Sequence, residues 1–157
     1  MKILVLGSGA REHALVHSLA NENAHEIVAA PGNIGIATEA ERIRINQSDP
    51  ELIAEFVRDE SIDLVVIGPE APLVAGVADA VRAEGVPVFG PSKAAAQLEG
   101  SKTFAKDVMQ RAGVPTGRAV RLTELADVAA TLDQYGAPYV IKADGLASGK
   151  GVIVTEE

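Results

Sequence analysis

The chain has 157 residues, of which 47% are hydrophobic but only 3% aromatic, so aliphatic side chains must fill its core. Its net charge of −8 disfavours nonspecific binding to nucleic acids. The absence of cysteine excludes disulfides and thiolate metal sites and suits a cytoplasmic protein. No apolar run is long enough to span a membrane, and the N-terminus does not resemble a signal peptide. Composition therefore predicts a cytoplasmic protein without a membrane or nucleic-acid partner.

The first ninety residues alternate short apolar runs with longer amphipathic ones. This alternation indicates an α/β fold, a Rossmann-like parallel sheet with flanking helices. Helices are expected at 11–21, at 50–59, with Ser48 or Asp49 as its cap, and at 74–84. Strands are expected at 2–6, 26–30, 63–67 and 86–89, with a weaker one at 42–45. Ligands of such sheets bind at the carboxyl ends of the strands, so the residues after each strand are the candidates for a site.

The pattern changes near residues 90–92, which predicts a first domain at 1–92 and an incomplete second one at 93–157. In the second part we expect a helix at 101–112, a strand at 118–121, a helix opened by Thr123, and two strands around a glycine-rich loop. The last strand has nothing further to pair with. Its open edge predicts self-association, or association with a missing C-terminal part.

The glycine-rich loop at 144–151 lies between two β-branched runs and contains three glycines, a serine and a lysine. Such a loop can direct several backbone N–H groups at a phosphate, and Lys142 and Lys150 add positive charge. It does not match a P-loop, because its glycines are one residue too close and Gly151 replaces the hydroxyl residue that would hold magnesium. A hairpin that covers phosphates fits better, while a plain turn with incidental lysines stays open.

The loop after the first strand reads GSGAREHA (7–14), and its G-x-G start and helix N-terminus can hold a phosphate. A dinucleotide fingerprint requires Gly or Ala in place of Glu12, and an acidic residue within 29–33, where none occurs. Both departures argue against NAD. A single sugar phosphate fits better, with Arg11 to neutralise its charge and Glu12 to accept from a hydroxyl or an amine.

Two further features of the sequence concern polar side chains. His13 and His17 have a metal-ligand spacing, but no third ligand lies nearby in sequence, so a polar helix start is the better interpretation of His13. Glu70 follows the third strand in a turn with two prolines, which direct it into the strand-end crevice. A solvated carboxylate is the alternative for Glu70.

Six motifs occur in the order found in phosphoribosylamine–glycine ligases, and the chain resembles this ATP-grasp family over its whole length. The helix start Arg-Glu-His-Ala is the most specific of them. The motifs are GSGAREHA (7–14), PGN (31–33), GPEAPL (68–73), GPS (90–92), QLEGSK (97–102) and IKADGLASGKG (141–151).

The resemblance implies an ATP-dependent carbon–nitrogen ligase of purine biosynthesis, with ATP and Mg²⁺ as cofactors. It would join 5-phosphoribosylamine and glycine to give glycinamide ribonucleotide, through a pre-ATP-grasp domain and the start of an ATP-grasp domain. The residues implied to bind the sugar phosphate or the amine are Gly7, Gly9, Arg11, Glu12, Asn33 and Glu70. Those implied to bind ATP are Lys102, Lys142, Asp144, Gly145, Ser148, Gly149, Lys150 and Gly151.

Members of this family are more than twice as long as the chain. The adenine-binding hinge and the acidic magnesium ligands are expected in the absent part, so no catalytic residue and no metal ligand is assigned here. Phosphoryl transfer without its metal loses its main electrostatic element, so we predict that the chain alone is not catalytically competent. Two alternatives stay open: another ATP-grasp ligase, and a stand-alone module that binds sugar phosphates or nucleotides.

Overall fold

The computed structural model describes residues 1–147 and 149–156 and divides into two compact units, Met1–Ala96 and Gln97–Glu157. Ser148, one of the residues implied to bind ATP, lies outside the described residues. The helix α5 (Lys93–Gly100), which the sequence pattern did not predict, crosses the division between the units. Within the described residues, no helix combines the length and the apolar character that crossing a membrane requires.

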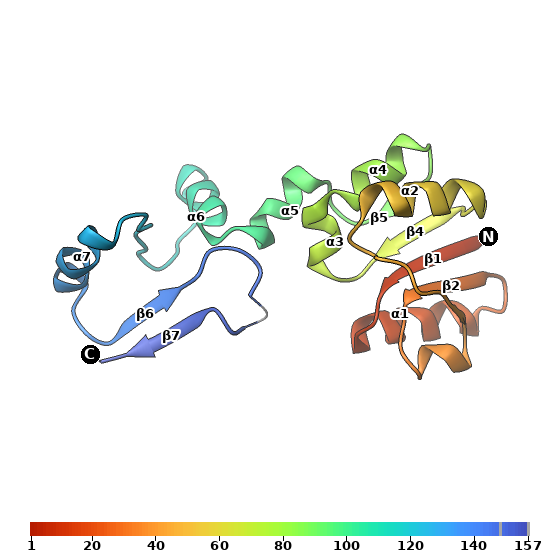
Figure 1. The fold of residues 1–157 in the computed structure, drawn as a ribbon, viewed down its shortest axis with the longest axis horizontal. Helices are drawn as coiled ribbons and strands as arrows, with labels where there is room; N and C mark the ends of the chain where they lie inside the picture. The colour runs from red at the N-terminus through yellow and green to blue at the C-terminus, as the bar shows by residue number, and fades with distance from the viewer. Residues whose placement is uncertain (148, 157) are drawn as a thin grey trace. The chain divides into compact units, whose positions relative to one another are not determined.

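The first unit is built on a parallel five-stranded sheet with the order β3-β2-β1-β4-β5. Figure 1 shows β1 between β2 and β4. The predicted α/β fold is confirmed, and the predicted strands lie in this sheet. The two edge strands are shorter than expected; after β3 the chain leaves the sheet, although Ile43 and Ile45 still pack against the core. The strands are β1 (Lys2–Gly7), β2 (Glu26–Pro31), β3 (Glu41–Arg42), β4 (Leu64–Ile67) and β5 (Val88–Phe89).

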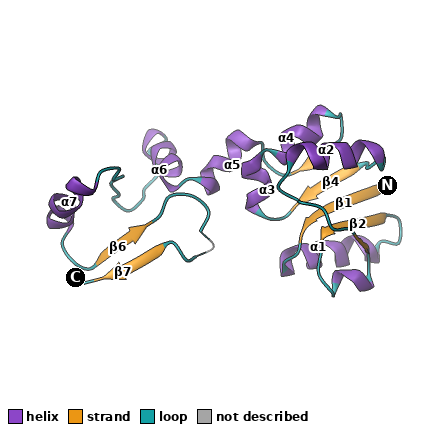
Figure 2. Cartoon of the chain, viewed as in Figure 1, coloured by secondary structure: helices purple, strands orange, loops and turns teal. Residues whose placement is uncertain are grey.

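Helices cover both faces of this sheet (Figure 2). Asp49 caps α2 by accepting a hydrogen bond from the Leu52 amide at 3.1 Å. Of the two predicted caps, Asp49 is therefore the one that the structure shows, and Ser48 is not. The prediction of a single helix at 74–84 is wrong. Gly76 adopts a left-handed conformation (φ +104°) and separates two shorter helices. The elements are α1 (Ala10–Asn21), the 3₁₀ turn η1 (Ile36–Thr38), α2 (Pro50–Asp59), α3 (Glu70–Ala75) and α4 (Val77–Ala83).

The core of the first unit has two parts, one on each face of the sheet. Successive residues of β1 alternate between them, as the two-residue period of a strand requires. One part contains Leu4 and Leu6 with residues of α2 and α4, and the other contains Ile3 and Val5 with Val16 of α1 and Ile36 of η1. This packing fixes the position of the carboxyl end of β1, from which the chain continues into α1.

The second unit contains α6 (Lys102–Arg111), η2 (Leu125–Asp127), α7 (Val128–Tyr135) and an antiparallel hairpin of β6 (Tyr139–Lys142) and β7 (Val152–Thr155). The predicted hairpin and the helix near 101–112 are confirmed. The prediction of a strand at 118–121 is wrong, because this segment is irregular. Within it, the guanidinium carbon of Arg118 lies 4.1 Å from the centre of the Tyr135 ring. The helix expected from Thr123 begins later, at Leu125. None of the described residues of this unit is buried.

Candidate ligand-binding sites

The first candidate site lies where the order of the sheet reverses. The chain runs outward from β1 through β2 and β3 and then returns to β4 on the other side of β1. Leu6 pairs with Ile67 at the carboxyl ends of β1 and β4, and the Gly68 amide donates to the Leu6 carbonyl at 3.1 Å. Parallel sheets bind ligands in the crevice at such a reversal, which here is bordered by Gly7 and Gly68.

Glu12 fills this crevice from the first turn of α1. Its Oε2 accepts a hydrogen bond from the Gly9 amide at 2.6 Å, and the residue is only 3% exposed. A Cβ added to Gly9 would lie 2.8 Å from Glu12 Oε2, and one added to Gly7 or Gly68 would overlap the glutamate side chain. Three glycines therefore make room for one buried carboxylate, an arrangement that sequence reasoning did not foresee.

Arg11 and Glu70 lie beside Glu12. Arg11 Nη2 is 3.2 Å from Glu70 Oε1, and Arg11 Nε is 3.9 Å from Glu12 Oε1. A hydrogen bond from its own backbone amide, together with the Arg11 guanidinium, holds the pKa of Glu70 below its usual value. The structure thus brings three of the predicted site residues together, while their roles toward a ligand stay predictions.

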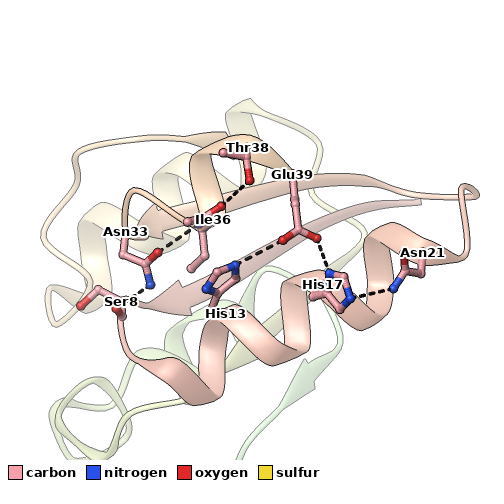
Figure 3. A network of polar contacts seen from close by, with 9 residues as sticks. Ser8, His13, His17, Asn21, Asn33, Ile36, Thr38 and Glu39 are labelled. Atoms are coloured by element: carbon pink, nitrogen blue, oxygen red, sulfur yellow. Dashed lines mark hydrogen bonds and ion pairs between the residues drawn. The ribbon is translucent and has the colours of Figure 1, made fainter.

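Asn33 ties the loop after β2 to the loop after β1 (Figure 3). Its Nδ2 donates to the Ser8 carbonyl at 3.0 Å, and its Oδ1 accepts from the Ile36 amide at 3.0 Å. The Gly32 amide also donates to the Gly7 carbonyl, at 3.0 Å. Asn33 therefore lies at the strand ends, where it fixes the shape of the loops.

A carboxylate shared by two histidines of α1 follows the 3₁₀ turn η1 (Figure 3). His13 Nε2 is 3.2 Å from Glu39 Oε1, and His17 Nδ1 is 2.6 Å from Glu39 Oε2. With Ala10 and Ala14, these side chains line a hollow of about 450 Å³. Across residues 1–147 and 149–156, no group of three metal-ligating side chains is arranged to hold a metal ion. The sequence did not indicate Glu39, because it lies more than twenty residues beyond the histidines.

We expect His17→Ala to raise the pKa of Glu39 toward its ordinary value. The hydrogen bond from His17 is the main cause that lowers this pKa, and the bond from His13 adds to it. Asn21→Ala is the control, because Asn21 contacts the far ring nitrogen of His17, at 3.1 Å. A carboxyl ¹³C NMR titration measures the shift; an unchanged Glu39 pKa in His17→Ala would contradict the assignment.

The second candidate site, in the second unit, is centred on Asp144 at the start of the glycine-rich loop. Its Oδ1 accepts from the Lys102 and Gly145 amides at 2.6 and 3.0 Å, and its Oδ2 accepts from Ser101 Oγ at 3.0 Å. Desolvation by itself would raise the pKa of Asp144, but hydrogen bonds from Thr103, Ser101 and the two amides lower it to about 2. The carboxylate therefore bonds the first amide of α6, whose N-cap residue is Ser101, and anchors the loop to this helix.

Lysines surround the same loop. Lys102 Nζ donates to the Gly145 carbonyl at 2.8 Å, whereas Lys142 ends β6 and Lys150 is exposed on the loop. The Ala143 amide donates to the Gly151 carbonyl at 2.7 Å and closes the base of the hairpin. Gly145 and Gly149 have positive φ angles of 96° and 75°, which favour glycine at both positions. The described ATP-site candidates thus gather around one loop.

Residues 1–99 match the family model of the phosphoribosylglycinamide synthetase N domain. The chain belongs to the phosphoribosylglycinamide synthetase family. Residues 100–157 match the ATP-grasp (A) domain of the same synthetase. The resemblance found from the six motifs is thereby confirmed.

Individual relatives agree with this assignment to the synthetase family. A phosphoribosylamine–glycine ligase of Leifsonia xyli subsp. xyli is 63% identical, over all of this chain but only 38% of the relative. The crystal structure of phosphoribosylamine–glycine ligase from Thermotoga maritima superposes with a TM-score of 0.79 at 30% identity, covering 100% of this chain and 36% of that one. The chain thus spans less than two fifths of these two relatives.

The fold also occurs outside the synthetase family. The biotin carboxylase domain of 2-oxoglutarate carboxylase from Hydrogenobacter thermophilus, determined with MgADP, has a TM-score of 0.76 at 24% identity. That comparison covers 99% of this chain and 38% of the other. At this identity the likeness concerns the fold alone.

Proposed function

We propose that the chain is the sugar-phosphate-binding domain, residues 1–92, and the beginning of the ATP-grasp domain, residues 93–157, of a cytoplasmic ligase. The ligase would join 5-phosphoribosylamine and glycine, with hydrolysis of ATP to ADP and phosphate, to give glycinamide ribonucleotide. The observation that carries the proposal is the meeting of Arg11, Glu12 and Glu70 at the reversal of a sheet whose chain belongs to this family. An exposed cation beside two carboxylates suits a ligand that has both a phosphate and an amine.

For the sugar phosphate, we assign Arg11 to the phosphate, and Gly7 and Gly9 to the loop that borders the bound sugar. The Arg11 side chain is 67% exposed and pairs with Glu70 at 3.2 Å and with Glu12 at 3.9 Å, so it can turn toward an incoming anion. Glu12, Asn33 and Glu70 are assigned to the hydroxyls or the amine, because their oxygens accept hydrogen bonds. The chain would thus hold the amine in position for its attack on the activated glycine carboxyl group.

For ATP, we assign the loop at 144–151 together with Lys102 and Lys142. The loop amides and the lysine ammonium groups suit a polyphosphate, and their charges would stabilise the phosphates as they separate. For Mg²⁺ we assign no ligand in this chain and expect its ligands in the remainder of the ligase, as the family resemblance implies. The exposed Val140, Ile153 and Val154 of the hairpin support contact with that remainder.

Calorimetric titration of the chain with glycinamide ribonucleotide tests the proposal. We expect binding that weakens about tenfold or more in Arg11→Ala, because a charge-assisted contact to phosphate is lost. Arg58→Ala is the control, since Arg58 lies on α2 and pairs with Asp59 and Glu84. NAD should not bind, and the chain alone should not turn over ATP, glycine and phosphoribosylamine. Binding of NAD without binding of the ribonucleotide would contradict the proposal.

A further inference from the structure

The carboxylate of Glu12 lies where a dinucleotide-binding sheet of this topology would hold a pyrophosphate. That place is the crevice between the ends of β1 and β4, against the first turn of the following helix. In this chain, Glu12 Oε2 already accepts from the Gly9 amide at 2.6 Å. The helix N-terminus therefore has an internal anion, and the Gly9 amide is not free to hold a ligand phosphate.

The second oxygen of the same carboxylate lacks a hydrogen-bond partner among the described residues. Glu12 Oε1 is buried, lies against Gly68, and receives no hydrogen bond. The Arg11 Nε atom, at 3.9 Å, is too distant to donate one. A buried acceptor without a donor is costly, so this atom indicates a donor that the chain itself does not supply.

We propose that Glu12 determines the specificity of the crevice: it excludes phosphate groups and accepts a hydrogen bond from a ligand hydroxyl or amine through Oε1. The exclusion follows from charge and space, because a phosphate would have to displace a buried carboxylate of the same sign. The acceptance follows from the unpaired oxygen, which only an N–H or O–H group can satisfy. A sugar phosphate would then place its phosphate outside the crevice, toward Arg11, and its donor groups inside.

The donor part of this proposal rests on the proposed function, whereas the exclusion of phosphate does not. Two variants separate the parts. Glu12→Gln keeps the shape of the side chain but removes its charge, and Glu12→Ala empties the crevice. Glu55→Ala is the matched control, because Glu55 is an exposed carboxylate on α2. Circular dichroism establishes that each variant is folded.

The probes are inorganic pyrophosphate and glycinamide ribonucleotide, titrated by calorimetry and by amide NMR of Gly7 and Gly9. We expect pyrophosphate to shift these amides in Glu12→Ala but in neither the wild type nor Glu55→Ala. We expect Glu12→Gln to bind the ribonucleotide about tenfold or more weakly than the wild type, because a charged acceptor is lost.

A folded Glu12→Ala variant that does not gain pyrophosphate binding would overturn the exclusion. A Glu12→Gln variant with wild-type affinity for the ribonucleotide would overturn the acceptor role. This titration still tests the acceptor role if the Glu12→Ala variant does not fold. Failure of the wild type to bind the ribonucleotide would instead contradict the proposed function and the acceptor role that rests on it. The pyrophosphate result would still decide the exclusion.

Discussion

Gly68→Ala should lower the free energy of unfolding of the first unit by about 1–3 kcal/mol, the usual cost of overfilling a packed site. The added methyl group would overlap Glu12 Oε1, Cγ and Cδ. The glutamate cannot move away cheaply, because it is buried and bonded to the Gly9 amide. The φ angle of Gly68 is not in the left-handed region, so the loss would come from the overlap alone.

Gly117→Ala is the control for this prediction, because a Cβ there meets nothing within 4 Å and the backbone is again not left-handed. Hydrogen exchange at the β1 amides reports on the first unit. Absorbance of Tyr135 and Tyr139, the only tyrosines in the chain, reports on the second unit. The double variant Gly68→Ala/Glu12→Ala should be about as stable as Glu12→Ala alone. If the double variant lost as much unfolding free energy as the two single variants together, this result would contradict the overlap of the added methyl group with Glu12.

Asp144→Asn should release the glycine-rich loop from α6. The amide side chain has one oxygen instead of two and no charge, so it cannot accept from Ser101, Lys102 and Gly145 together. Loss of a side-chain hydrogen bond to an amide at a helix N-terminus costs about 1 kcal/mol, which corresponds to about fivefold faster hydrogen exchange at the start of α6 and in the loop. On the proposed function, we expect the whole ligase to lose affinity for ATP more than for the ribonucleotide.

The same contacts should depend on acidity. The pKa of Asp144 in the folded chain, about 2, lies below the ordinary value of 3.8. The ionised side chain therefore stabilises the fold above pH 3.8, and this contribution disappears as the pH falls through about 2. Carboxyl ¹³C NMR gives the pKa, and exchange mass spectrometry follows the loop. Asp133→Asn, an exposed change on α7, is the control, and an equal effect of both substitutions would contradict the role of Asp144.

In both candidate sites, a glycine-rich segment carries a side-chain carboxylate that lies at the N-terminus of a helix. Glu12 accepts a hydrogen bond from the Gly9 amide at the start of α1, and Asp144 accepts one from the Lys102 amide at the start of α6. Both carboxylates take up amides that a bound phosphate could otherwise use. On the proposed function, the phosphates would therefore be held by Arg11 in the first unit and by the lysines and remaining loop amides in the second.

Local patterns in the sequence determined the α/β class, the strands of the parallel sheet, the helix at 50–59, the glycine hairpin and the family. These features depend on residues close together in the chain: apolar alternation, capping side chains and short motifs. One error arose where one residue overrode a continuous pattern, as Gly76 does. Another error arose at 118–121, where a segment predicted to be a strand has no neighbouring strand within the described residues.

Only the tertiary structure decided what the candidate site residues contact. The sequence placed Glu12, Arg11 and Glu70 after two strands, but the pairing of β1 with β4 brings them together. It is this pairing that brings Gly68 against Glu12, fifty-six positions away in the chain. Asp144 likewise reaches the start of α6 from more than forty residues downstream. Such contacts depend on the packing of distant segments, which a local pattern does not record.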